Sequence, residues 1–274
     1  MLRKELLRKE VSRRLSRRLG LTITVELVLG LLLSVGVIWL FAQIVEEVID
    51  GESRRFDEAA LLWINDNLPA WFDGPMLLAT ALGYYLVILP LLVVVTYAFY
   101  RKGAKISATL LPVATLGSMI LTEVLKRIFQ RARPELFDSG YYASGYSFPS
   151  GHATLAVGFY GTLALLLAWR LEGFWRWAVV VAGVALVLLI GLSRMYFGAH
   201  YPTDVLAGFL AAPLWVSAVG LSYLLWRTVR GPREDADQPG VETSPGDDNF
   251  PGRSKRATCR TARPLRRGGG CSAM

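Results

Sequence analysis

The chain contains only two histidines, and each lies at a polar stretch that leads into an apolar segment. His152 lies in "SFPSGHATL" (147–155), and His200 lies in "GAHYPTD" (198–204). An imidazole can act near neutral pH as a nucleophile or as a general acid and base. Two imidazoles placed alike in a very apolar chain therefore indicate shared chemistry, if the fold brings their segments together.

Three fixed cations accompany them in the same polar stretches, at Lys126, Arg133 and Arg194. Three cations at one site repel one another unless an anion lies among them, and phosphate suits both the planar fork of arginine and the point charge of lysine. Ser150 and Gly151 open the apolar segment that follows, where backbone N–H groups at a helix start favour negative charge. These five residues predict a phosphate-binding site.

The two histidines can then divide a phosphoryl transfer. One imidazole attacks phosphorus, and the other protonates the leaving oxygen and later helps to activate water. Asp204 follows His200 by four residues, with Pro202 suited to a helix start between them, so its carboxylate can hold the far nitrogen of a nucleophilic ring. His152 has no carboxylate so close in sequence, which suits a general acid. No group of carboxylates is placed to hold a metal, so we expect no cofactor, with the cations stabilising the transition state.

The composition indicates a polytopic membrane protein. Of 274 residues, 53% are hydrophobic and 19% charged, whereas soluble domains carry about 25% charged residues. Several apolar blocks reach the roughly 20 residues that cross a bilayer. We expect an all-α bundle of six transmembrane helices, at 21–45, 76–100, 106–125, 152–169, 178–193 and 205–226. The first block is longer than the apolar part of a signal peptide and is expected to be a retained anchor.

Shorter segments complete the expected organisation. Residues 1–20 form a basic arm, 21–226 the membrane domain, and 227–274 a tail whose composition predicts disorder. "FDEAALLWINDNL" (56–68) predicts an amphipathic helix at the membrane interface. The tail holds both cysteines, Cys259 and Cys271, which have no metal spacing and imply no disulfide framework.

Basic residues predict the orientation. The net charge of +8 is concentrated at the chain ends, which indicates membrane topology rather than nucleic-acid binding. Six spans place both ends on one side, and that side carries 23 Lys and Arg residues against 7 on the other. By the positive-inside rule, both termini are cytoplasmic. The loops 126–151 and 193–204 then lie on the outer side at one depth, where the candidate site residues can converge.

Three motifs together resemble the signature of the phosphatidic acid phosphatase type 2 family, whose soluble relatives are acid phosphatases and vanadium haloperoxidases. The motifs are Lys126-x6-Arg133-Pro134, Pro149-Ser150-Gly151-His152 and Ser193-Arg194-x5-His200-x3-Asp204. The six-span layout extends the resemblance from 126–204 to about 21–226. The resemblance implies that His200 is the nucleophile, His152 the acid and Asp204 the orienting carboxylate. It also implies phosphate binding by Lys126, Arg133 and Arg194, assisted by Ser150 and Gly151.

These features predict an integral membrane lipid phosphatase of the plasma or inner membrane. Its substrate is expected to be a lipid-linked phosphate monoester or pyrophosphate, such as a polyprenyl pyrophosphate, phosphatidylglycerol phosphate or phosphatidic acid. A lipid phosphotransferase of the same fold remains an alternative. A lipid or anion transporter is less favoured, because the charged residues cluster at span ends and no inverted repeat is visible. A non-catalytic relative that only binds lipid phosphate would be expected to lack one of the histidines or Asp204, and this chain keeps all three. The oligomeric state stays open.

Other polar residues nearby receive structural interpretations. Arg127 and Arg131 are expected to be solvated or to touch lipid headgroups. Glu123 is expected to pair with Lys126 on one helix face. The tyrosines of the long loop are expected in the interfacial aromatic belt, with contact to the acyl chain of the substrate as the alternative; they are Tyr141, Tyr142 and Tyr146.

Overall fold

The computed structural model describes residues 30–230. The predictions for the basic arm, the start of the first span, the tail beyond residue 230 and both cysteines lie outside the described residues. Within 30–230 the chain forms helices joined by turns and loops, without a strand, so the all-α prediction is confirmed there.

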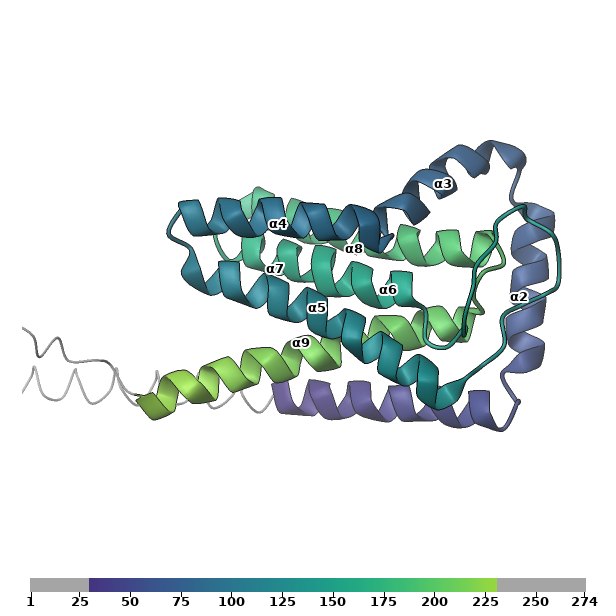
Figure 1. The fold of residues 1–274 in the computed structure, drawn as a ribbon, viewed down its shortest axis with the longest axis horizontal. Helices are drawn as coiled ribbons and strands as arrows, with labels where there is room; N and C mark the ends of the chain where they lie inside the picture. The colour runs from purple at the N-terminus through teal and green to yellow at the C-terminus, as the bar shows by residue number, and fades with distance from the viewer. Residues whose placement is uncertain (1–29, 231–274) are drawn as a thin grey trace, which may run out of the picture. The chain divides into compact units, whose positions relative to one another are not determined.

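The elements follow one another along the chain as Figure 1 shows. They are the helix Gly30–Ile49, α2 (Arg54–Asn67), η1 (Ala70–Phe72), α3 (Asp73–Leu82), α4 (Tyr85–Arg101), α5 (Lys105–Phe129), α6 (Gly151–Ala156), the π-helical turn η2 (Val157–Gly161), α7 (Thr162–Ala168), α8 (Gly173–Tyr196) and α9 (Pro202–Arg230).

Five of these helical segments within 30–230 are long and apolar enough to cross a membrane, and a sixth counts if α3 and α4 form one broken span. The axes of that pair are bent by 55°, so the apolar block 76–100, expected as one transmembrane helix, forms two helices joined at a break. The break lies at Gly83 and Tyr84, where Tyr84 has an extended backbone (ψ 138°). A Cβ on Gly83 would lie 2.5 Å from Ile190 Cγ2 and 3.1 Å from His152 Cδ2, so only glycine permits this close approach.

Helix ends extend beyond the apolar blocks that predicted them. Lys126 lies in the last turn of α5 and Arg194 in the last turn of α8, whereas both were expected at loop starts. Asp204 lies in the first turn of α9, which begins at Pro202 as the sequence suggested. Apolar patterning ends where the hydrocarbon ends, but helical hydrogen bonds continue into the interface. These three side chains are therefore held by helix termini rather than by loops.

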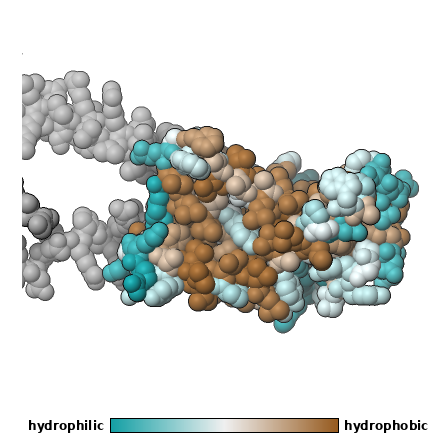
Figure 2. Space-filling view, turned by 90° about the horizontal axis from the view of Figure 1, so that it is seen from above, coloured by the Kyte–Doolittle hydropathy of each residue, from teal (hydrophilic) through white to brown (hydrophobic). Residues whose placement is uncertain are grey.

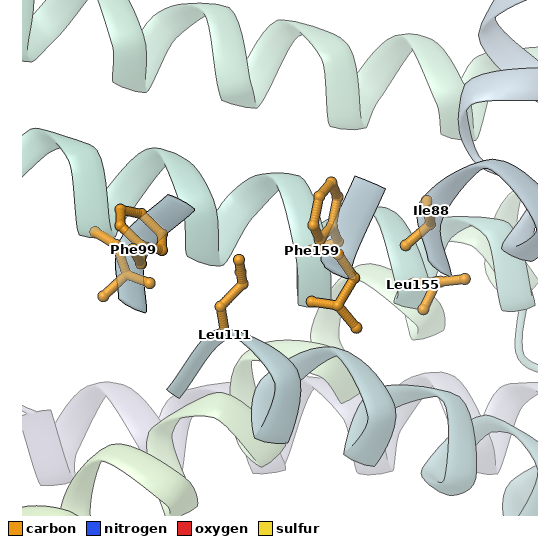
Figure 3. Packing of buried hydrophobic residues seen from close by; sticks show 7 residues of the cluster. Ile88, Phe99, Leu111, Leu155 and Phe159 are labelled. Atoms are coloured by element: carbon orange, nitrogen blue, oxygen red, sulfur yellow. The ribbon is translucent and has the colours of Figure 1, made fainter. Parts of the chain in front are cut away.

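A hydrophobic cluster joins α4, α5, α6 and α7 in the interior (Figure 3). It consists of Ile88, Leu92, Phe99, Leu111, Leu155, Phe159 and Leu166. Leu155 lies in α6 one turn after His152, so this packing anchors the helix start that carries the candidate acid.

The outer surface of the bundle is apolar. Figure 2 shows a band of hydrophobic side chains across the middle of one face, with hydrophilic residues toward both ends. Large exposed apolar side chains of α4, α5 and α8 include Leu86, Val93, Ile120, Val181 and Leu188. Such a continuous exposed apolar band is unfavourable in water and favourable in hydrocarbon. The chain is a multi-pass membrane protein.

The predicted interfacial helix is present as α2. Its inner face buries Asp57, Leu61 and Ile64, and its outer face exposes Phe56 and Trp63. Figure 1 shows α2 lying across the end of the bundle, beside the beginning of α9. The inner face includes a carboxylate, which apolar packing alone does not explain.

Candidate active site

The candidate site lies at the end of the bundle covered by the 130–150 loop. A cavity of about 600 Å³ opens between the α3–α4 break, the ends of α5 and α8, the start of α6, the loop residues 141–144, and His200 just before α9. Six of the eight predicted site residues line it: Lys126, Arg133, Gly151, His152, Arg194 and His200. The other two, Ser150 and Asp204, are fully buried beside it. Residues as distant in sequence as Leu77 and His200 thus line one cavity.

Arg133 is held in place by backbone carbonyls. Its Nε donates to the oxygen of Gly145 (2.9 Å), its Nη2 to that of Ser144 (2.9 Å) and its Nη1 to that of Ala199 (2.6 Å). The same Nη1 lies 3.2 Å from Nε2 of His200. Burial lowers the pKa of the Arg133 guanidinium, and the neighbouring Arg194 acts in the same direction. An arginine nevertheless stays charged, so a cation lies beside the imidazole.

Arg194 is the largest fully buried side chain of the described part, at 1% exposure. Its Nη1 donates to the Thr80 hydroxyl of α3. Its Cζ lies 4.7 Å from the ring centre of Tyr141, which stacks on Phe197 at 5.2 Å. Tyr141 was predicted for the interfacial belt but lies inside the site, where its ring covers the guanidinium. The sequence carried no signal for either Thr80 or Tyr141, because both contacts are made across the fold.

His200 and Asp204 are not joined directly. Nδ1 of His200 lies 3.6 Å from Oδ2 of Asp204, which exceeds hydrogen-bond distance. The Ser147 hydroxyl lies 3.3 Å from Nδ1 and donates a short hydrogen bond to Oδ2. Because the hydroxyl proton of Ser147 points to Asp204, the Ser147 oxygen can only accept a hydrogen bond from the His200 ring. We therefore assign the ring proton of His200 to Nδ1. Nε2 then carries the lone pair that faces Arg133. Ser147 is a site residue that the sequence reasoning missed.

Burial lowers the pKa of the His200 imidazole to about 4, with Arg194 and Arg133 acting in the same direction and Asp204 opposing them. The side chain is only 2% exposed. At neutral pH the ring is therefore uncharged, which is the form in which an imidazole is a nucleophile.

The start of α6 differs in one respect from expectation. The backbone N–H of Ser150 donates to the carbonyl of Asp204 (2.9 Å), so it is not free to bind an anion as predicted. The Ser150 hydroxyl, His152 Nε2 and Arg194 Nε are instead buried without a hydrogen-bond partner, three of six such side-chain atoms in the described part. The His152 ring stacks on Tyr84 at 5.9 Å. Buried polar atoms normally have partners, so these three indicate a polar ligand.

Arg131 contradicts its expected role as a solvated or headgroup-facing residue. Its side chain is 15% exposed and forms ion pairs of 2.7 Å with both Asp57 and Asp204. The Asp57 partner comes from α2, so the contact depends on tertiary structure and sequence proximity gave no signal for it.

Comparisons with known proteins identify the family of this chain. The family model described as the PAP2 superfamily matches residues 107–229. Phosphatidylglycerophosphatase B of Bacillus subtilis is 36% identical over 144 residues, which cover 51% of this chain and 69% of the relative. Undecaprenyl-diphosphatase of Sulfolobus acidocaldarius is 30% identical over 186 residues, covering 66% and 84%.

A solved structure extends the similarity to the fold. The crystal structure of a transmembrane PAP2-type phosphatidylglycerolphosphate phosphatase from Bacillus subtilis superposes with a TM-score of 0.66 at 26% identity. The alignment covers 71% of this chain and 97% of that chain. The family interpretation of the three motifs is confirmed. The chain belongs to the PAP2 superfamily, as a multi-pass membrane phosphatase that hydrolyses phosphoric esters.

Proposed function

We propose that the protein hydrolyses a lipid-linked phosphate monoester or pyrophosphate at the outer face of the plasma or inner membrane, through a phosphohistidine on His200. The observation that carries this proposal is the arrangement around one cavity. The unprotonated Nε2 of His200 faces Arg133, and the buried Arg194 Nε and Ser150 hydroxyl lack partners beside it. A phosphoryl group placed there would satisfy these donors while its phosphorus faces the imidazole.

The binding step rests on charge. Lys126, Arg133 and Arg194 line the cavity, and none of them takes part in the ion pairs found within residues 30–230. The charge of a bound phosphate would offset their mutual repulsion. A Cβ at Gly151 would lie 4.0 Å from Lys126 Nζ, so the ammonium group lies close to the α6 start. The cations thus surround the position where negative charge grows in the transition state.

The chemical step follows in two halves. Nε2 of His200 attacks the terminal phosphorus, and the bond from that phosphorus to the leaving oxygen breaks. This oxygen is the ester oxygen of a lipid monoester or the bridging oxygen of a lipid pyrophosphate, and His152 gives its proton to it. Water then attacks the phosphohistidine, passes its proton to His152, and the P–N bond breaks to release inorganic phosphate. The Ser147–Asp204 pair holds the Nδ1 proton and stabilises the imidazolium character that develops during attack.

The walls of the cavity support a lipid substrate. Beside the cations it is lined by Leu77, Tyr85, Met119 and Leu155, from helices whose outer faces are apolar. A phosphate bound at the cations can therefore extend an apolar chain toward hydrocarbon. The named relatives act on a glycerophospholipid phosphate and on an undecaprenyl diphosphate, and we propose the same substrate classes here, with polyprenyl pyrophosphate first.

Orientation and organisation are part of the same proposal. With six spans, including the bent α3–α4 pair, and a cytoplasmic basic arm and tail, the site faces outward. Arg101, Lys102 and Lys105 lie at the turn between α4 and α5, at the end of the bundle away from the site. This distribution supports the positive-inside assignment.

A phosphotransferase would form the same phosphohistidine and pass the group to a lipid hydroxyl instead of water. The test is phosphate release from purified protein in detergent, with EDTA present, across prenyl and glycerol lipid phosphates. We expect release from at least one lipid and none from His200→Ala. Activity of His200→Ala equal to the unmodified protein would refute the nucleophile assignment. Turnover only when a lipid alcohol is added would show a transferase, and no turnover with any lipid would refute both.

A further inference from the structure

The helix α2 carries a buried carboxylate that the reaction does not use. Asp57 is 0% exposed and lies on the face of α2 that packs toward α8 and α9. A buried carboxylate is costly unless it is paired and hydrogen-bonded. Its partners should therefore show why it is there.

Asp57 has three donors. Oδ1 accepts from the backbone N–H of Thr203 (3.1 Å), and Oδ2 accepts from the Thr203 hydroxyl (2.7 Å) and from Arg131 Nη2 (2.7 Å). Thr203 is the second residue of α9, so Asp57 caps the helix that carries the orienting carboxylate.

Arg131 continues the contact to the reaction centre. Its Nη1 donates to Asp204 Oδ1 (2.7 Å) and to the Thr203 hydroxyl (2.8 Å). Its guanidinium also lies 4.3 Å from the ring centre of Tyr201. Burial by itself would lower the pKa of Arg131, but Asp204 and Asp57 together raise it. The cation is thus fixed between two carboxylates.

Asp204 has little freedom left. Arg131 occupies Oδ1, while Oδ2 accepts from the Tyr201 N–H (2.9 Å) and from Ser147. The direction of Oδ2 decides where Ser147 lies, and Ser147 contacts His200 Nδ1. A rotation of the carboxylate would move the nucleophile through this chain of contacts.

We propose that Asp57 and Arg131 are positioning residues, which act through Asp204 and Ser147 to hold His200 for attack. The proposal rests on the proposed function, since it concerns the same nucleophile. The interfacial helix α2 thereby becomes part of the catalytic scaffold. Neither residue lines the cavity, so the substrate is not their partner.

The first test compares kcat with KM for Asp57→Asn and Arg131→Gln. Asparagine keeps an oxygen for the Thr203 N–H and removes the charge that faces Arg131. We expect kcat to fall about 10- to 100-fold, because small misplacements of a reacting group cost that much. KM and inhibition by inorganic phosphate should change by less than about threefold, since the three cations are untouched. Arg131→Lys should recover little, because one ammonium cannot bridge two carboxylates as a guanidinium does.

The control is Asp73→Asn, which removes a carboxylate at the same end of the bundle that accepts from Tyr196 of α8 and does not reach Asp204. Its kcat should stay within about twofold. The double variant Asp57→Asn/Arg131→Gln separates positioning from folding. Removing both buried charges should restore thermal stability relative to Arg131→Gln, while kcat stays low because Asp204 still lacks its cation. The proposal would be overturned if the double variant recovered kcat together with stability. It would also be overturned if the kcat of each single variant stayed within about twofold of that of the unmodified protein.

A readout without turnover keeps this test separate from the proposed function. In His152→Ala protein with a histidine-free tag, His200 is the single imidazole, and NMR follows its titration. The charged groups that face it are Asp204, Arg194 and Arg133. Arg131→Gln removes the cation on Asp204 and should raise the midpoint by about half a unit or more, whereas Asp73→Asn should leave it in place. An unmoved midpoint would refute the link even if no lipid were hydrolysed.

Discussion

Nδ1 of His200 lies 3.6 Å from Oδ2 of Asp204, and the Ser147 hydroxyl contacts both atoms. The carboxylate therefore orients the ring through an intermediate hydroxyl. This arrangement gives Ser147 a role in holding the Nδ1 proton, and it leads to the first prediction.

Ser147→Ala should lower kcat about tenfold or more with little change in KM, because the ring loses its link to Asp204 while the three cations proposed to bind phosphate remain. The matched control is Ser118→Ala. Ser118 is also a fully buried serine, but its hydroxyl donates only to Ala114 of its own helix. Steady-state kinetics on one lipid phosphate measures both variants. Equal kcat for the two variants would show that the hydroxyl is not needed.

The His200 imidazole should titrate far below the value of an ordinary histidine. With a pKa of about 4 in the folded protein against 6.5 for the free side chain, NMR of the His152→Ala protein should give a midpoint near 4. Bound inorganic phosphate should raise that midpoint, since a nearby anion favours the imidazolium. A midpoint near 6.5 without phosphate would contradict the burial and the cation cluster.

The same difference predicts a loss of stability in acid. The folded pKa lies below the unfolded one, so between pH 6.5 and 4 the unfolded chain binds the proton first. The free energy of unfolding should therefore fall as the pH is lowered through this window, by at most about 3 kcal/mol from this group. Thermal unfolding in detergent compares the protein with His200→Gln, whose dependence on pH should be weaker. Parallel curves would exclude the contribution.

Arg194→Lys should lower kcat/KM about 100-fold, although the charge is kept. A lysine cannot bond Thr80 and present a second donor to phosphate in the fixed geometry of a guanidinium. The control is Arg170→Lys at the other end of the bundle, where Arg170 donates to Ser107 and lies over Phe99. Its activity should stay within about twofold. Comparable losses in both variants would indicate a general requirement for arginine in folding.

Gly208 allows α9 to approach the start of α6. A Cβ there would lie 2.8 Å from the Ser150 carbonyl oxygen and 3.0 Å from the Ala153 Cβ. Gly208→Ala should therefore destabilise the protein by about 1–3 kcal/mol. Gly220→Ala on the same helix, where a Cβ meets nothing within 4 Å, should be neutral or stabilising. Thermal unfolding of the two variants decides between a packing requirement at Gly208 and a general effect of alanine in α9.

The sequence by itself determined the family and the class of the protein, and it predicted the chemistry proposed for its site. Apolar blocks predicted the membrane helices because hydrocarbon requires about 20 apolar residues per span. The motifs around His152 and His200 predicted a phosphate site because few other ligands suit clustered cations with two imidazoles. Counting the spans was enough to place both motifs on the same side of the membrane, because the third and fifth loops of such a chain lie on one side.

Tertiary structure decided the contacts that join distant segments. Arg131 was expected in solvent but is buried between Asp57 and Asp204, and Tyr141 was expected at the interface but covers Arg194. The block expected as one helix over 76–100 is broken at Gly83, where Ile190 and His152 occupy the space that a side chain would need. Residue types report which groups are present, whereas partners across the fold depend on the packing distance and direction of helices. Those distances exist only once the bundle has assembled.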